Sequence, residues 1–176
     1  IAHFSAAGTT NVETGDPLET DSIFRIYSMT KPVTGVAMMI LYEEGKWRLD
    51  DPVSTYIPGF ADLEVYAGAG PNGDPRLEAP ASPMTMRQLM THTAGFEEQI
   101  KGLIGHDRDA IPPYDELLKQ WVPERIFDAG ETPAYSNYGT SLAGYIVERV
   151  SGEPFDDYVE RHIFDPLGME DSTFRQ

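Results

Sequence analysis

Apolar residues at helical spacing are the main feature of the hydrophobic and polar pattern along the chain. The pattern predicts long helices, with the first over residues 30–44, and a shorter one over residues 52–56. The other predicted helices lie over residues 85–95, 114–122, 142–152 and 154–163. The helix from Thr85 also carries a start signal, because Thr85 and Gln88 have the spacing of a capping box.

Patterns typical of strands occur only in the first quarter of the chain. Residues 1–14 predict a weak strand pair, and residues 23–27 predict a strand that leads into the first long helix. Residues 67–83 are rich in glycine and proline and predict an irregular surface excursion. Two or three strands beside one helix cannot form a well-covered sheet, so the predicted sheet is incomplete or very small.

Composition limits the class of protein. The chain has 176 residues with 40% hydrophobic content, which suits one compact domain. It has no apolar run of about 18 residues, so the sequence predicts no membrane-spanning segment. No signal peptide is visible, and the chain starts with Ile1 instead of Met, which is consistent with a processed or truncated N-terminus. The compartment of this soluble chain, cytoplasmic or exported, and its oligomeric state stay open.

Charge and cysteine content exclude several functions. The net charge of −16 argues against nucleic acid and anionic membranes as partners. The absence of cysteine excludes a thiol nucleophile and a disulfide scaffold. His3, His106 and His162 lack metal-ligand spacing, so we expect no metal and no cofactor. His92 is predicted to end a helix and to bond backbone carbonyls.

The first candidate for chemistry is the pair Ser28 and Lys31, at the predicted junction of strand and helix. A spacing of three residues places both side chains on one helix face, with Cβ atoms roughly 5–6 Å apart. A serine hydroxyl needs a base to take its proton before it can act as a nucleophile. Proximity to the positive end of the helix dipole favours the neutral amine, which can help to accept that proton.

The second candidate is Tyr135-Ser136-Asn137, the single Tyr-x-Asn of the chain. It lies on a predicted loop before a helix, where catalytic side chains are commonly held. The α/β-hydrolase alternative has no support, because no Gly-x-Ser-x-Gly nucleophile elbow occurs. Serine, lysine, tyrosine and asparagine in this order therefore indicate nucleophilic catalysis.

These residues and their surroundings resemble the serine β-lactamase and penicillin-binding-protein superfamily, in its class C-like branch that includes β-lactamase-related carboxylesterases. The order and spacing of the matching segments agree with the family over nearly the whole chain. The matching segments are Phe24–Val33, Leu41–Lys46, Leu49–Val53, Met84–Gly95, Tyr135–Gly139 and Pro166–Met169.

The resemblance implies a role for each site residue. Ser28 is expected to be the nucleophile that forms an acyl-enzyme, and its backbone N–H is expected to supply half of the oxyanion hole. Lys31 is expected to bond Ser28 and to hold Tyr135 toward its phenolate. Tyr135 is expected to act as the general base, and Asn137 to bind substrate and position Lys31. An unperturbed tyrosine ionises only near pH 10, so it needs such a nearby cation.

One element of the family pattern is missing from residues 1–176. The family carries a third motif, Lys-Thr-Gly or a His-x-Gly or Trp-x-Gly equivalent, on a strand that also supplies the second oxyanion donor. No such motif follows the Tyr-x-Asn here. The resemblance therefore predicts an N-terminal fragment of a longer hydrolase, with an incomplete active site and marginal stability because a sheet edge is left unpaired.

The expected fold is α+β and β-lactamase/transpeptidase-like, with an incomplete antiparallel sheet and a mostly helical region. Residues 1–50 are expected to hold the N-terminal strands and the nucleophile helix. Residues 51–176 are expected to form the helical region that carries the Tyr-x-Asn loop, and the C-terminal part that completes the sheet is expected to be absent.

The resemblance leaves open the substrate class and whether this member of the family is catalytic. We favour a carboxylesterase that acts on a small-molecule ester. A β-lactamase or a D-amino-acid peptidase would use the same residues on a lactam or an amide. A non-catalytic member that binds ligands or builds an assembly is the third reading, although intact Ser28, Lys31 and Tyr135 argue against it.

Overall fold

The computed structural model describes residues 2–99 and 112–175 and divides the chain into two units. The first unit is Ile1–Thr30 and the second is Lys31–Gln176. The hydrophobic core belongs to the second unit. The predicted division into residues 1–50, with the nucleophile helix, and residues 51–176, with the Tyr-x-Asn loop, stays a prediction.

The first unit consists of turns and extended chain. Residues 8–18 form a small closed loop with one isolated bridge, Thr9 to Pro17, so the predicted strand pair is wrong. Residues 23–26 join no strand ladder in the described part of the chain, and Tyr27–Met29 form a 3-10 turn. The predicted strand over 23–27 is therefore also wrong, because alternating apolar residues form a strand only where a neighbouring strand supplies hydrogen bonds.

Helix α1 spans Thr30–Glu43 and confirms the first predicted helix. Its apolar stripe is buried through Ala37, Met38 and Leu41. Just beyond the helix, the indole N–H of Trp47 donates to the Met38 carbonyl at 2.8 Å and fixes the following chain against α1. Burial of one such large side chain stabilises the fold by about 1.5–3 kcal/mol.

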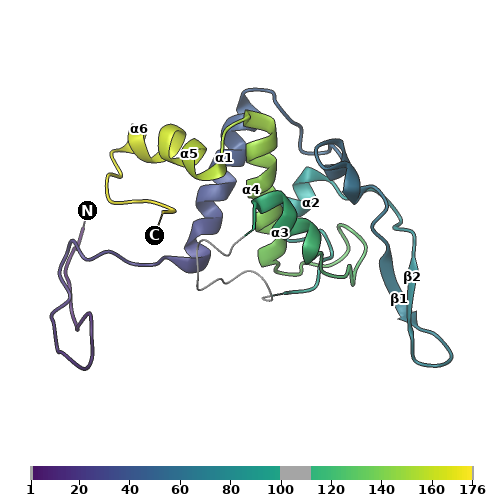
Figure 1. Ribbon diagram of the computed structural model, residues 1–176, viewed down its shortest axis with the longest axis horizontal. Coiled ribbons are helices and arrows are strands. Elements are labelled where there is room, and N and C mark those ends of the chain that lie inside the picture. The colour runs from purple at the N-terminus through teal and green to yellow at the C-terminus, as the bar shows by residue number, and fades with distance from the viewer. Residues whose placement is uncertain (1, 100–111, 176) are drawn as a thin grey trace. The chain divides into compact units, whose positions relative to one another are not determined.

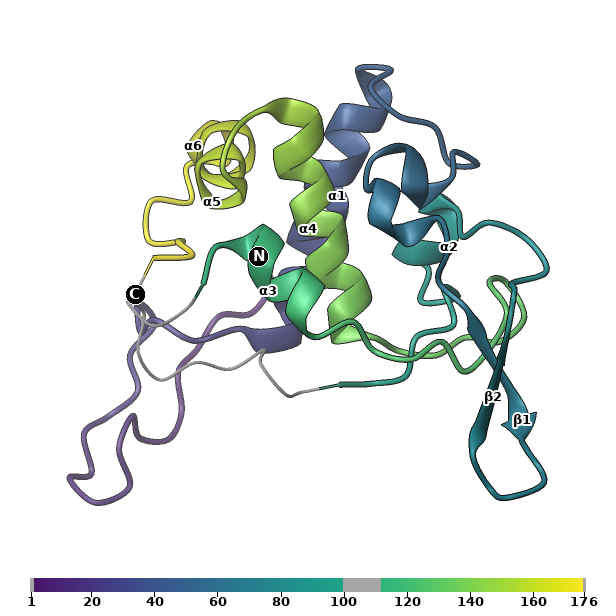
Figure 2. The ribbon, with the colours of Figure 1, turned by 45° about the vertical axis from the view of Figure 1, so that its right-hand side comes forward.

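Helix α4 spans Asn137–Ser151 and lies beside α1 in both views (Figures 1 and 2). Its residues Leu142, Ile146 and Val147 are fully buried in the same core cluster. The helix ends at Gly152, as predicted. It begins five residues before the predicted segment, because the Ser136 hydroxyl caps it by accepting a hydrogen bond from Gly139 N at 3.0 Å.

Shorter elements complete the helical part. Helix α2, Met86–Met90, starts at the predicted capping box of Thr85 and Gln88 but is shorter than predicted. Helix α3 spans Tyr114–Gln120. The other short elements are the 3-10 turns Val53–Thr55 and Pro58–Phe60, helix α5 (Phe155–Val159), the π-helical turn Glu160–Phe164 and helix α6 (Asp165–Leu167).

The excursion predicted as irregular contains a hairpin. Strand β1, Val65–Ala69, pairs antiparallel with strand β2, Pro75–Glu78. The register shifts between Tyr66 and Ala69, so the pairing is irregular, and β2 is exposed throughout. The hairpin extends away from the helices in both views (Figures 1 and 2). The glycine and proline residues predicted an excursion from the helices. They did not predict its two strands, because the sequence there lacks the apolar and polar alternation that is typical of strands.

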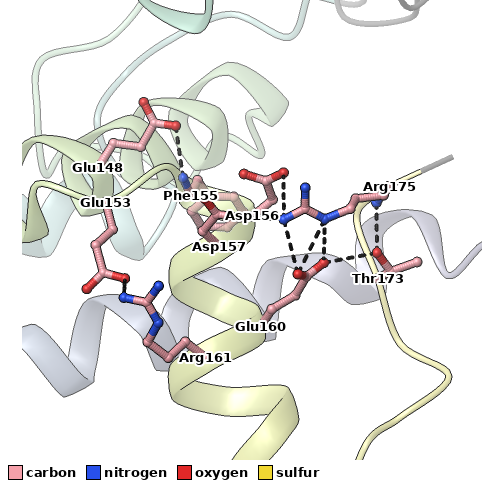
Figure 3. Close-up of polar contacts among 9 residues, drawn as sticks. All are labelled: Glu148, Glu153, Phe155, Asp156, Asp157, Glu160, Arg161, Thr173 and Arg175. Atoms are coloured by element: carbon pink, nitrogen blue, oxygen red, sulfur yellow. Dashed lines mark hydrogen bonds and ion pairs between the residues drawn. The ribbon is translucent and has the colours of Figure 1, made fainter.

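The last residues of the described chain are held by Arg175. Its guanidinium binds the carboxylates of Asp157 and Glu160 on the preceding helical turns (Figure 3). Its backbone N–H donates to the Thr173 hydroxyl at 2.9 Å. The hydrogen bond from Arg175 lowers the pKa of the Glu160 carboxyl. These groups are exposed, so water screens the ion pairs, which position the segment more than they stabilise the fold.

Candidate functional site

The site in the second unit forms where the first turn of α1 meets the N-terminus of α4. Lys31 lies in that first turn, and Asn137 is the first residue of α4. The Lys31 ammonium donates to Asn137 Oδ1 at 2.5 Å, although the two residues are 106 positions apart in the chain. Such a charge-assisted hydrogen bond is roughly twice as strong as a neutral one. The predicted contact between Lys31 and Asn137 is therefore present.

Tyr135 contacts the same oxygen, Asn137 Oδ1. Its hydroxyl donates to Asn137 Oδ1 at 3.4 Å, and Lys31 Nζ lies 4.5 Å from the centroid of the Tyr135 ring. The Tyr135 side chain is 48% exposed, so the phenol is open to solvent. A nearby cation favours the charged form of a phenol, so the arrangement suits proton uptake by Tyr135.

Ser28 lies in the 3-10 turn directly before α1, in the first unit of the chain. It is exposed, and the preceding Tyr27 has a φ of 46°, a left-handed conformation that is uncommon for a residue with a side chain. The chain therefore presents the serine on a strained turn three residues before Lys31. Its approach to Tyr135 and its role as nucleophile stay predictions.

His92 supports the Tyr135 segment, a role that the sequence did not indicate. Its ring stacks on the Tyr135 ring with centroids 4.8 Å apart, and its Nδ1 accepts the backbone N–H of Ser136 at 3.2 Å. This differs from the predicted contact with helix carbonyls, because α2 has already ended. His92 has a φ of 56°, and this left-handed turn directs the chain away from the helix.

The electrostatic surroundings keep the His92 ring neutral. Burial lowers the pKa of His92, the Lys31 charge lowers it further, and the Glu98 carboxylate opposes them. A neutral imidazole has one nitrogen free to accept a hydrogen bond, and here that nitrogen is Nδ1. The low pKa therefore preserves the bond from Ser136 N–H that fixes the backbone beside Tyr135.

Glu98 contacts Asn137 from the other side of the amide. Its Oε1 accepts from Asn137 Nδ2 at 2.6 Å, and its Oε2 accepts from Asn137 backbone N at 3.1 Å. No sequence pattern marks Glu98, because a carboxylate outside any motif carries no recognisable signal. The contact depends on the chain reversal after α2, which brings Glu98 to the start of α4.

Neither a metal site nor a membrane span is found in the described residues. Within residues 2–99 and 112–175, no group of three or more His, Cys, Asp or Glu side chains is placed to hold a metal ion. No helix there is long and apolar enough to cross a membrane. His106 lies outside the described residues.

Comparisons with known proteins identify the family of this chain. The Beta-lactamase family model matches residues 1–176. The putative penicillin-binding protein PbpX of Bacillus subtilis is 34% identical over 151 residues, which are 86% of this chain and 32% of PbpX. Esterase EstB of Burkholderia gladioli is 30% identical over 185 residues, which are 99% of this chain and 44% of EstB.

A solved structure shows the same fold. The LovD9 mutant of simvastatin synthase from Aspergillus terreus superposes with a TM-score of 0.74 and 29% identity, over 94% of this chain and 44% of that protein. The predicted α+β, β-lactamase/transpeptidase-like fold class is thereby confirmed. The chain spans less than half the length of each of these three proteins. The predicted incompleteness of the active site stays a prediction.

Proposed function

Since this chain belongs to the beta-lactamase family, we propose that it acts as a serine hydrolase with an acyl-enzyme on Ser28. The observation that carries the proposal is the convergence on Asn137 Oδ1. The Lys31 ammonium reaches that oxygen from the first turn of α1, and the Tyr135 hydroxyl reaches it from the loop directly before α4. An amine and a phenol held together, with an exposed serine three residues before that amine in the chain, match the requirements for activating a hydroxyl.

The proposed reaction starts once the Tyr135 hydroxyl, which donates to Asn137 Oδ1 in the structure, has released its proton to solvent, so that Tyr135 is a phenolate beside the Lys31 ammonium. Tyr135 takes the proton of the Ser28 hydroxyl while Ser28 Oγ forms a bond to the substrate carbonyl carbon. The Ser28 backbone N–H donates to the oxyanion that develops. When the intermediate collapses, the bond to the leaving group breaks, and the leaving group receives the proton from Tyr135.

Deacylation repeats these steps with water. Tyr135 takes a proton from the water, whose oxygen bonds to the acyl carbon, and returns that proton to Ser28 Oγ as the ester bond breaks. Lys31 stays protonated throughout and compensates the charge on Tyr135. Asn137 keeps Lys31 next to the phenol, through the hydrogen bond of 2.5 Å.

We propose a carboxylic ester as the substrate class. The similarity to a protein named esterase EstB, which extends over 99% of this chain, favours it. The similarity to a protein named a putative penicillin-binding protein favours a second candidate, an amide or lactam substrate. The same serine chemistry serves both, because each substrate presents a carbonyl carbon with a leaving group.

A fluorophosphonate probe tests the nucleophile in the full-length parent protein. We expect labelling that disappears in Ser28→Ala and persists in Ser5→Ala, a matched change at another exposed serine. Unchanged labelling of Ser28→Ala would exclude Ser28 as the nucleophile. Parallel assays with a short-chain nitrophenyl ester and a chromogenic cephalosporin then separate the esterase from the lactamase.

Tyr135→Phe tests the general base. We expect acylation to slow at least about 100-fold, the low end for loss of a general base. Tyr66→Phe is a suitable control, because Tyr66 is similarly exposed, at 42% against 48%, and lies on the hairpin. Near-normal acylation of Tyr135→Phe would remove Tyr135 from the mechanism.

A further inference from the structure

The side chain of Asn137 has to present its oxygen, and not its nitrogen, to Lys31. An asparagine amide has an acceptor and a donor of nearly the same size and shape, so packing alone distinguishes the two orientations poorly. The ammonium of Lys31 can only donate, and it lies 2.5 Å from Oδ1. With the amide reversed, two donors would face each other at this position.

Glu98 supplies the complementary half of the arrangement. An ionised carboxylate can only accept, and Glu98 accepts one hydrogen bond from the side-chain Nδ2 of Asn137 and one from its backbone N. A donor-only group on one side and an acceptor-only group on the other leave a single orientation of the amide that satisfies both. That orientation also offers Oδ1 to the Tyr135 hydroxyl.

We propose that Glu98 is a positioning residue for the reaction, which holds the Asn137 amide with its oxygen toward Lys31 and Tyr135. The proposal rests on the proposed function, because it assigns Glu98 a task in that site. Glu98 acts through Asn137 and is not assigned any contact with the substrate.

The isosteric change Glu98→Gln isolates this task. Glutamine keeps the shape of the side chain but offers one oxygen acceptor to two Asn137 donors. Either one donor loses its partner, or the Asn137 amide reverses and turns Nδ2 toward the Lys31 ammonium. Both outcomes weaken the hold on Lys31. We expect kcat/KM to fall roughly ten- to hundredfold, as for loss of a hydrogen bond to a charged group.

The pH profile distinguishes this role from a structural one. Among residues 2–99 and 112–175, the charged and titratable groups near Lys31 include Tyr135, His92 and, beyond Asn137, Glu98. Loss of an acceptor and of a negative charge both disfavour the ammonium of Lys31. The alkaline limb of kcat/KM should therefore move to lower pH in Glu98→Gln. A change that only loosened the fold would lower the rate without moving this limb.

The experiment compares Glu98→Gln with Glu97→Gln in the full chain, with the nitrophenyl ester as substrate. Glu97 is a neighbouring exposed carboxylate, whereas the carboxylate that accepts from Asn137 is that of Glu98. We expect the loss of rate and the moved limb in Glu98→Gln only. Glu98→Asp, which keeps an acceptor-only group, should retain more activity than Glu98→Asn, a matched pair that decides the question even if Glu98→Gln does not fold.

Three results would overturn the proposal. One is a kcat/KM of Glu98→Gln within twofold of the parent while Ser28→Ala is inactive. Another is equal activity of Glu98→Asp and Glu98→Asn. The third is an identical shift of the alkaline limb in Glu97→Gln, which would mean that the shift comes from the lost negative charge alone and not from the contact of Glu98 with Asn137. Turnover that survives Ser28→Ala would instead overturn the proposed function, and the role of Glu98 with it.

Discussion

Gly95 allows the chain to pass close to a neighbouring backbone just after His92. A Cβ placed on Gly95 would lie 2.0 Å from the backbone oxygen of Phe127, and the residue has a φ of 87°. The Gly95 carbonyl also accepts from Ile126 N at 2.8 Å, so the two segments are hydrogen-bonded at the same place. We predict that Gly95→Ala destabilises the fold, because a backbone oxygen cannot rotate out of the way as a side chain can.

Two costs add up in Gly95→Ala. A left-handed conformation costs a residue with a Cβ about 1–2 kcal/mol. Displacement of the backbone of Phe127 from a well-packed position adds about 1–3 kcal/mol, the usual cost of overpacking. The sum is about 2–5 kcal/mol, which lowers the melting temperature by roughly 4–20 °C for a chain of this length.

Gly152→Ala is the matched control. Gly152 has a similar φ of 79°, but nothing lies within 4 Å of the position of its Cβ. It should therefore show the conformational cost alone, so the two variants should differ by about 1–3 kcal/mol. Thermal melts followed by circular dichroism, together with urea titrations, measure both. Equal losses of stability in Gly95→Ala and Gly152→Ala would refute the steric reasoning.

Three other changes have defined outcomes. Ser136→Ala removes the cap of α4 and should cost about 1 kcal/mol in urea titrations, whereas Ser136→Asp should restore most of it. The folded state lowers the pKa of His92 below the ordinary histidine value of about 6.5, so the unfolded chain binds more protons just below that pH. Stability therefore falls as the pH drops through this window. Urea midpoints at about pH 5 and about pH 7.5 should therefore differ less in His92→Gln than in the parent, while exposed His3→Gln should leave the difference unchanged. The Tyr158 hydroxyl is buried with no hydrogen-bond partner among the described residues, so Tyr158→Phe should melt at or above the parent temperature. Tyr138→Phe, which removes a buried bond of 2.8 Å, should cost about 1 kcal/mol; an equal loss in Tyr158→Phe would contradict this account.

Local chemistry made much of the helical framework predictable from the sequence. The apolar spacing after Lys31 predicted α1, and the capping box at Thr85 predicted the start of α2. Gly152 predicted the end of α4. These signals depend on residues within one or two helical turns, so no knowledge of the remaining chain is needed to recognise them. The strand predicted over residues 23–27 failed for the complementary reason, because a strand requires a partner elsewhere.

For the site, the sequence by itself determined the candidate groups: Ser28 and Lys31 by their spacing, and Tyr135 and Asn137 by their motif. Only the tertiary structure decided that Lys31 and Tyr135 share the oxygen of Asn137. It also decided that His92 and Glu98 support that arrangement. Local patterns could not indicate the contacts of Lys31, His92 and Glu98 with the segment 135–137, because each of them joins residues dozens of positions apart in the chain. The packing of α1 and α4, with the left-handed turn at His92, brings these residues within hydrogen-bond distance.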